Sequence, residues 1–214
     1  MGGARPHAPP SEPPFVGLTG GLGAGKSTAL ELLRELGAAT LSSDAVVHEL
    51  LERADVARAV AERFGPGVLR EGRVDRAALA ARVFHDPAAR RQLEELLWPL
   101  VGEEIAAWRA RALAAVPPPR ALVVEVPLLF EAGLDTAFDT TVAIVTDDAV
   151  RRARIADRDQ VALAERERQQ LTQEEKAARA DHVVRNDGSR EALRDELSRS
   201  EERRVGKECR SRWS

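Results

Sequence analysis

The chain has 214 residues, of which 43% are hydrophobic and 31% are charged, a balance that fits one globular domain and excludes disorder of the whole chain. The net charge of −3, from 32 basic and 35 acidic residues, gives no overall positive field, so we expect no nucleic-acid partner. The single cysteine, Cys209, excludes an internal disulfide. The sequence has no run of eighteen apolar residues, which a membrane span needs, and no apolar N-terminal segment, which a signal peptide needs. We therefore expect a cytoplasmic protein with no membrane partner.

Both ends of the chain differ in composition from the part between them. Residues 1–14 are rich in proline and lack an apolar period, which predicts a disordered leader. Residues 201–214, with the sequence EERRVGKECRSRWS, resemble translated vector sequence and are interpreted as non-native, although an ordinary charged tail has the same composition. The folded unit is therefore predicted to cover residues 15–198.

Within that unit, short apolar or β-branched runs alternate with helical patterns. A strand is predicted at 15–19, a helix at about 25–36 that ends at Gly37, and a weaker strand at 38–41. Further strands are predicted at 121–126, 140–145 and 182–184. Strands separated by helices indicate βαβ units, and therefore an α/β fold with a parallel sheet.

Two stretches interrupt this alternation. Residues 45–116 are nearly all helical in pattern, with helix starts at Asp75 and at Asp86-Pro87, and are too long for one crossover, so we predict an inserted helical lobe. Residues 157–181 are dense in charge and poor in large apolar side chains, with a capping-box start at Thr172. A segment of that composition is expected to pack little and to move, which is typical of a lid.

A phosphate-binding motif follows the first predicted strand. Residues 20–27, GGLGAGKS, fit the pattern G-x-x-x-x-G-K-[ST] between a strand and a helix, where glycines let backbone N–H groups converge on a phosphate. Lys26 is then expected to reach the β- and γ-phosphates of ATP, and the Ser27 hydroxyl to bind Mg²⁺. The alternative is a plain glycine-rich turn into a helix. The residues predicted to hold ATP here are Gly21, Gly23, Ala24, Gly25, Lys26, Ser27 and Thr28.

The rest of the sequence narrows the class of nucleotide-binding protein. The N-K-x-D and D-x-x-G motifs of GTPases and the L-S-G-G-Q signature of ABC proteins do not occur in the chain. A small-molecule or nucleotide kinase remains, in which a three-layer P-loop core carries an acceptor lobe and a mobile lid. The two interruptions of the α/β pattern match those two parts.

Several motifs in order resemble the dephospho-coenzyme A kinase family. They are the run 16–28 that begins with Val16 and contains Thr19, then Asp44, Phe84-His85-Asp86-Pro87, Leu93-Glu94, Pro99-Leu100, Pro127-Leu128-Leu129-Phe130-Glu131, Ala180-Asp181 and Asn186-Asp187-Gly188. The resemblance extends from about Val16 to Arg194. It implies a P-loop NTPase fold and an enzyme that uses ATP to phosphorylate the ribose 3′-hydroxyl of dephospho-coenzyme A, the last step of coenzyme A synthesis. We expect it to act as a monomer.

The resemblance also implies roles for residues on the acceptor side. Thr19 and Asp44 would meet the acceptor, and Asp44 would orient or deprotonate its hydroxyl, although from spacing alone Asp44 fits equally well as the N-cap of a helix at 45–51. Glu125 ends an apolar strand, at the position where P-loop proteins hold a carboxylate near Mg²⁺. The alternative is a solvated glutamate at the end of an ordinary buried strand. The acceptor pocket would be lined by Pro127, Leu128 and Leu129, with plain core packing as the alternative.

Other implied roles fall in the lid and after the last strand. Arg158 and Arg166 align with lid arginines, and Arg158 is the first candidate to neutralise the transferred phosphoryl group, while a solvated helix face is the alternative. Asn186 and Gly188 lie where related kinases contact adenine, or they form a simple N-D-G turn. The predicted catalytic residues are therefore Lys26, Asp44 and Arg158.

The chain departs from the family pattern at three positions. Ser42 stands where the family usually has the first aspartate of Asp-Ala-Asp, His48 where it has an arginine, and Trp98 where it has a histidine. These changes concern acceptor geometry more than ATP binding. Two rival functions stay open: another small-molecule kinase, acting on a nucleoside or a sugar acid, or an ATP-binding module without turnover.

Overall fold

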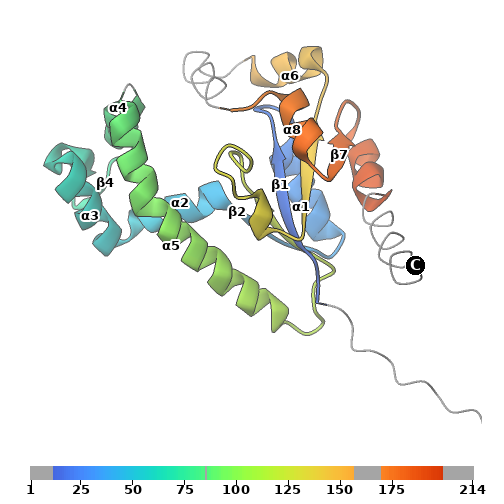
Figure 1. Cartoon of the computed structure of the whole chain (residues 1–214), viewed down its shortest axis with the longest axis horizontal. Helices are drawn as coiled ribbons and strands as arrows, with labels where there is room; N and C mark the ends of the chain where they lie inside the picture. The colour runs from blue at the N-terminus through green and yellow to red at the C-terminus, as the bar shows by residue number, and fades with distance from the viewer. Residues whose placement is uncertain (1–11, 85, 157–169, 200–214) are drawn as a thin grey trace, which may run out of the picture.

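The computed structural model describes residues 12–84, 86–156 and 170–199 (Figure 1). Residues 1–11 of the predicted leader, the predicted lid arginines Arg158 and Arg166, and the tail 201–214 lie outside the described residues. Within them, no helix is both long enough and apolar enough to cross a bilayer.

A parallel five-stranded sheet forms the centre of the molecule. Its order is β2 (Ala39–Ser42), β5 (Leu122–Glu125), β1 (Phe15–Gly20), β6 (Thr140–Val145) and β7 (His182–Arg185). All neighbouring strands are parallel, and each predicted strand is confirmed to within one residue at either end. Every residue of β1 is buried because the strand lies between two others and under helices on both faces.

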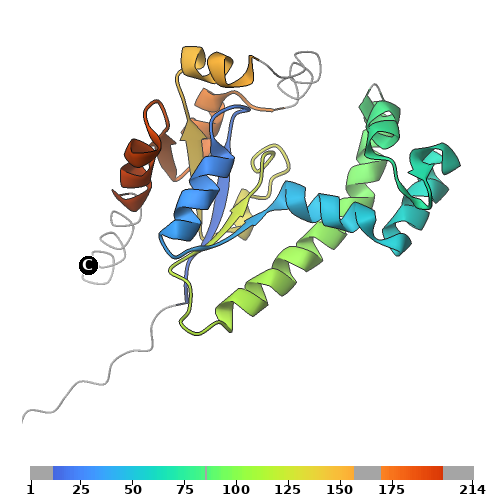
Figure 2. The ribbon, with the colours of Figure 1, turned by 180° about the vertical axis from the view of Figure 1, so that it is seen from behind.

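Helices cover both faces of the sheet, which confirms the three-layer α/β fold. On one face, α1 (Lys26–Glu35) and the helical residues 190–199 form an apolar cluster with the sheet that includes Leu33, Val123 and Leu193. Figure 2 shows α1 in front of the sheet. On the other face, the end of α5 (Pro87–Leu113) and the region of α8 (Gln173–Arg179) cover a second cluster. Helix α6 (Asp148–Ile155) follows β6.

The inserted lobe has an apolar cluster of its own. It is built from α2 (Ser43–Glu52), α3 (Ala54–Phe64), α4 (Arg76–Phe84) and the first half of α5, around Val60, Leu79 and Leu97. Helix α5 carries apolar side chains of both the lobe and the sheet face, and with 27 residues it joins the two parts (Figure 1). The predicted starts are confirmed: Asp75 accepts from the N–H groups of residues 77 and 78, and Asp86 from those of residues 88 and 89.

One part of the lobe differs from the prediction of a nearly all-helical insertion. A single 3₁₀ turn (Pro66–Val68) leads into a hairpin made of β3 (Leu69–Arg70) and β4 (Arg73–Val74). Both turn residues, Glu71 with φ 52° and Gly72 with φ 78°, are left-handed, as a two-residue hairpin turn requires. Strands of two residues are too short to show an alternating pattern, so helical periodicity on either side concealed them.

Candidate active site

The glycine-rich motif forms a loop between β1 and the start of α1. Gly25 is the N-cap residue of α1, and its φ of 93° is left-handed. No side chain caps this helix among the described residues, and its first turn has no acidic residue. The first N–H groups of α1 and the positive end of the helix are therefore suited to a phosphate.

Lys26 lies in the loop that it is predicted to serve. Its Nζ donates to the carbonyl oxygens of Gly20 at 3.0 Å and Gly21 at 3.1 Å. Burial lowers the pKa of Lys26, and Lys176 lowers it further, whereas the negative charges of Glu125 and Asp44 raise it. Lys26 thus has two acidic groups close enough to influence its pKa.

Glu125, Ser42 and Asp44 meet at the carboxyl edge of the sheet. Glu125 ends β5 and is paired in register with Ser42, which ends β2. Burial raises the pKa of Glu125, and Asp44 adds to that effect, while Lys26 and a hydrogen bond with the Ser42 side chain oppose it. Ser42 therefore supplies a hydroxyl, next to Glu125, where the family usually has a second carboxylate.

Asp44 does not cap the helix that follows, so that interpretation is wrong. Helix α2 begins one residue earlier than predicted, at Ser43, which makes Ser42 the N-cap residue and puts Asp44 in the first turn. The Asp44 side chain is exposed. The structure therefore leaves its carboxylate accessible at the same edge as Lys26 and Glu125.

The chemistry of these donors fits a Mg²⁺ ion that is shared with a nucleotide. Mg²⁺ is commonly bound through one or two carboxylates together with substrate phosphates and water. Ser27 is exposed at the start of α1, and Glu125 and Asp44 supply carboxylates that influence each other and the neighbouring Lys26. In the part of the chain that the structure describes, no three His, Cys, Asp or Glu residues gather as a metal cage of their own.

The segment after β5 is divided between the core and the site. Pro127 and Leu128 are half-buried, whereas Leu129 is completely buried in the apolar cluster beneath the sheet. Leu129 therefore packs in the core, which was the alternative interpretation, and its side chain is not open to an acceptor. Thr19 is also completely buried, and its hydroxyl donates to the carbonyl of Pro127 at 3.3 Å. Thr19 thus supports the segment that follows β5 through its backbone.

Asn186 contacts the phosphate-binding loop. Its side chain is 6% exposed, and Nδ2 donates to the carbonyl of Ala24 at 2.8 Å. Its own carbonyl accepts from the Thr146 hydroxyl at 2.8 Å and from Arg154 Nη2 at 3.0 Å. A Cβ at Gly25 would clash with Asn186 Nδ2, which is why this loop position needs glycine. Asn186 therefore acts on the loop backbone, and the predicted adenine contact would have to coexist with these bonds.

Asn186→Ala is expected to lower the affinity for ATP about tenfold and the free energy of unfolding by about 1–3 kcal/mol, because the buried Ala24 carbonyl loses its partner. Nucleotide titration and denaturant unfolding measure the two effects. Gly188→Ala is the comparison: Gly188 is exposed, and an added Cβ would lie 3.3 Å from the Ala192 Cβ, a tight contact that requires a small shift. An equal loss in both variants would contradict the loop role and favour a direct adenine contact.

Residues 170–181, the end of the predicted lid, do not pack loosely as expected. The predicted capping box at Thr172 and Glu175 is confirmed, and Lys176 of α8 is completely buried. Gln173 Oε1 accepts from the backbone N–H of Thr146 at 3.0 Å, its Nε2 donates to the Thr146 carbonyl at 3.1 Å, and the side chain lies against Gly21. Sequence reasoning missed these contacts, although the scarcity of lysine in the chain is a signal that singles out Lys176.

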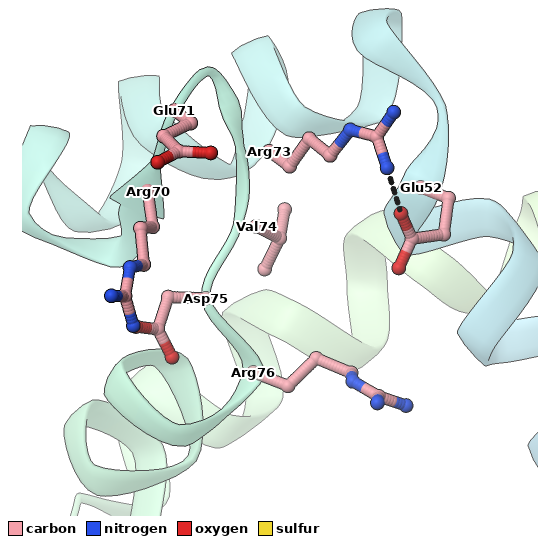
Figure 3. Close-up of a pocket in the computed structure, with 7 residues that line it drawn as sticks. All are labelled: Glu52, Arg70, Glu71, Arg73, Val74, Asp75 and Arg76. Carbon is pink, nitrogen blue, oxygen red and sulfur yellow. Dashed lines mark ion pairs between the residues drawn. The ribbon is translucent and has the colours of Figure 1, made fainter.

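A separate cavity of about 520 Å³ lies in the lobe, around the β3–β4 hairpin (Figure 3). Its lining is mainly charged, and Arg73 pairs with Glu52 across it at 3.6 Å. The lining residues are Glu52, Arg70, Glu71, Arg73, Val74, Asp75 and Arg76. None of the predicted site residues contributes to it, so the candidate active site is the phosphate loop and the adjoining sheet edge.

A parallel sheet, a phosphate loop that opens a helix, and a lysine within electrostatic range of two carboxylates define the class of P-loop kinases. The model of the dephospho-CoA kinase family matches residues 14–192. The chain belongs to the dephospho-CoA kinase family.

Individual relatives agree with this assignment. The chain is 44% identical over 183 residues to the dephospho-CoA kinase of Anaeromyxobacter dehalogenans, covering 83% of this chain and 86% of that one. It is 40% identical over 185 residues to that of Symbiobacterium thermophilum, with 84% and 77% covered. Among solved structures, the protein TT1252 of Thermus thermophilus matches with a TM-score of 0.77 and 32% identity over 92% of this chain and 98% of that one. The dephospho-CoA kinase of Campylobacter jejuni matches with a TM-score of 0.59 and 25% identity, over 89% and 96%.

Proposed function

We propose that this chain transfers the γ-phosphoryl group of ATP to the ribose 3′-hydroxyl of dephospho-coenzyme A, giving coenzyme A and ADP. The observation that carries the proposal is that Lys26, Glu125 and Asp44 influence one another beside the phosphate loop, where no described side chain caps helix α1. Membership of the dephospho-CoA kinase family supports the same proposal. In support of the proposal, this arrangement combines positive charge and hydrogen-bond donors suited to a nucleotide with an accessible carboxylate suited to an acceptor.

Direct in-line transfer suits this set of side chains. Phosphoryl transfer depends on positioning and charge neutralisation more than on a strong base. Lys26 and the first N–H groups of α1 hold the phosphates, and Asp44 orients the attacking hydroxyl and accepts its proton. Asp44 suits this role because its side chain is exposed and lies in the first turn of α2, the first helix of the acceptor lobe.

Ser27 and Glu125 are the residues proposed to hold Mg²⁺, which when bound to the nucleotide would neutralise phosphate charge. The raised pKa of Glu125 means that this carboxyl gains from a neighbouring cation, because its charged form is disfavoured by burial. Arg158 stays the predicted lid cation, and the monomeric state and the cytoplasmic location also stay predictions.

The deciding experiment measures ADP release from the purified chain with ATP and Mg²⁺, in the presence and absence of dephospho-coenzyme A. We expect release to depend on the acceptor and the product to carry its new phosphate on the 3′-hydroxyl, which mass spectrometry of fragments identifies. Nucleosides and sugar acids in the same assay test the rival kinases. Binding of ATP without ADP release with any acceptor would contradict turnover and favour a binding module.

A further inference from the structure

Lys176 is a buried cation that the proposed reaction does not use. Its side chain is 0% exposed, and Nζ lies 2.9 Å from Glu131 Oε1, on a side chain that is 15% exposed. The same Nζ donates to the carbonyl of Pro127 at 2.5 Å. Burial lowers the pKa of Lys176, and the hydrogen bond and charge of Glu131 oppose that change.

The two groups that Lys176 contacts are the ends of the acceptor segment, residues 127–131. The Pro127 carbonyl also accepts from the Thr19 hydroxyl, at 3.3 Å, so one oxygen joins β1, the segment and α8. Glu131 Oε1 additionally accepts from the N–H of Leu171 at 2.7 Å. The segment is therefore fixed to α8 at both ends and to β1 at its beginning.

The same helix contacts the phosphate loop. Gln173, one turn before Lys176, lies against Gly21, and its amide is fixed by hydrogen bonds with the backbone N–H and the carbonyl of Thr146. Helix α8 thus sets the distance between the loop proposed to hold ATP and the segment proposed to hold the acceptor. A displacement of about 1 Å between reacting groups can cost a hundredfold in rate, so such a brace has a direct effect on transfer.

A role in stability alone does not account for this arrangement. Replacement of a buried ion pair by well-packed hydrophobic residues of similar volume is often neutral or even stabilising, so the pair is weak support for a purely structural role. We propose that Lys176 is a positioning residue that holds residues 127–131 at the acceptor side of the active site through the Pro127 carbonyl. The inference rests on the proposed function.

The central test is the double variant Lys176→Met/Glu131→Gln, which removes the cation without leaving an unpaired carboxylate. We expect a folded protein whose kcat/KM for dephospho-coenzyme A falls at least about tenfold, because the Pro127 carbonyl loses its strongest donor. Its KM for ATP should change less than about twofold, since the phosphate loop keeps its own bonds. Circular dichroism and thermal unfolding report the folded fraction, to which the rates are normalised.

Glu131→Gln alone separates the ion pair from the Pro127 contact. Lys176 can lose its proton when the carboxylate is gone and still donate to Pro127, so acceptor kinetics near wild type are expected even if the double variant does not fold. A tenfold loss in this single variant would overturn the route through Pro127. Arg179→Met is the matched control, because Arg179 is an exposed cation of the same helix.

The outcomes distinguish the inference from the proposed function. A wild-type chain with acceptor-dependent ADP release and a folded double variant with unchanged acceptor kinetics would overturn the positioning role alone. Equal losses toward ATP and acceptor would also overturn it, because a structural defect does not discriminate between the two substrates. A wild-type chain without acceptor-dependent release would contradict the proposed function, and the positioning role with it.

Discussion

Lys26→Ala is expected to lower kcat by about 10³-fold or more while the protein stays folded. The lysine supplies the ammonium charge of the phosphate loop. Loss of a single group that stabilises transition-state charge commonly lowers kcat by about 10²–10³-fold, and we expect the loss here to reach at least the upper end of that range. The fold should survive because the bonds lost are those to two loop carbonyls, at Gly20 and Gly21, and not contacts of the apolar core. ADP release and circular dichroism measure the two effects.

The control for this variant is Arg34→Ala, which removes an exposed cation from the other end of the same helix. Activity near wild type is expected there. Near-wild-type turnover in Lys26→Ala would contradict the assignment of the phosphate loop. If the Lys26→Ala protein unfolds, the hydrogen bonds of Lys26 to the loop carbonyls serve mainly to stabilise the fold.

Asp44→Asn is expected to reduce kcat by about 10²–10³-fold and to leave the KM for ATP within about twofold, since general-base and orienting groups contribute on that order. Asparagine keeps the shape of the side chain and can still orient a hydroxyl, but it cannot accept a proton. Because the N-cap of α2 is Ser42, the change should not shorten that helix. Steady-state kinetics with each substrate varied in turn measures the split.

Glu49→Gln provides the comparison, as it neutralises an exposed carboxylate of the same helix. It should leave both kinetic parameters unchanged. If Asp44→Asn instead destroys ATP affinity, Asp44 belongs to the Mg²⁺ site and not to the acceptor. Repeating the titration over a range of Mg²⁺ concentrations would identify that case, since excess metal would restore binding.

The features that the sequence predicted well are local ones. Strands at 15–19 and 140–145 are continuous apolar or β-branched runs, and they fold as β1 and β6. The helix starts at Asp86 and Thr172 are also confirmed, because a cap depends on a side chain and N–H groups only two or three residues away. The phosphate loop belongs to this group, since its motif and its flanking elements are contiguous.

The features that sequence reasoning missed join distant parts of the chain. Asn186 and Ala24 are 162 positions apart, and Lys176 and Pro127 are 49 apart. No periodicity encodes such pairs, and the high charge and few large apolar side chains of residues 157–181 made them resemble a solvated segment, although Lys176 is buried. The role of Asp44 was ambiguous for a related reason. The same local sequence is compatible with an N-cap and with an acceptor contact, and only the residue at which the helix starts distinguishes the two.

The central position of β1 has a consequence for synthesis of the protein. This strand is made first, yet its partners are Leu122 in β5 and Thr140 in β6, more than a hundred residues later. On the ribosome, its apolar residues must wait for the whole lobe and half of the sheet to emerge, a period in which chaperones are the natural protection against aggregation. The phosphate loop waits longest, for Asn186. A chain cut short by a premature stop codon just before that residue would carry the complete nucleotide motif without the bond that shapes it, and we expect it to bind ATP more weakly than the full chain.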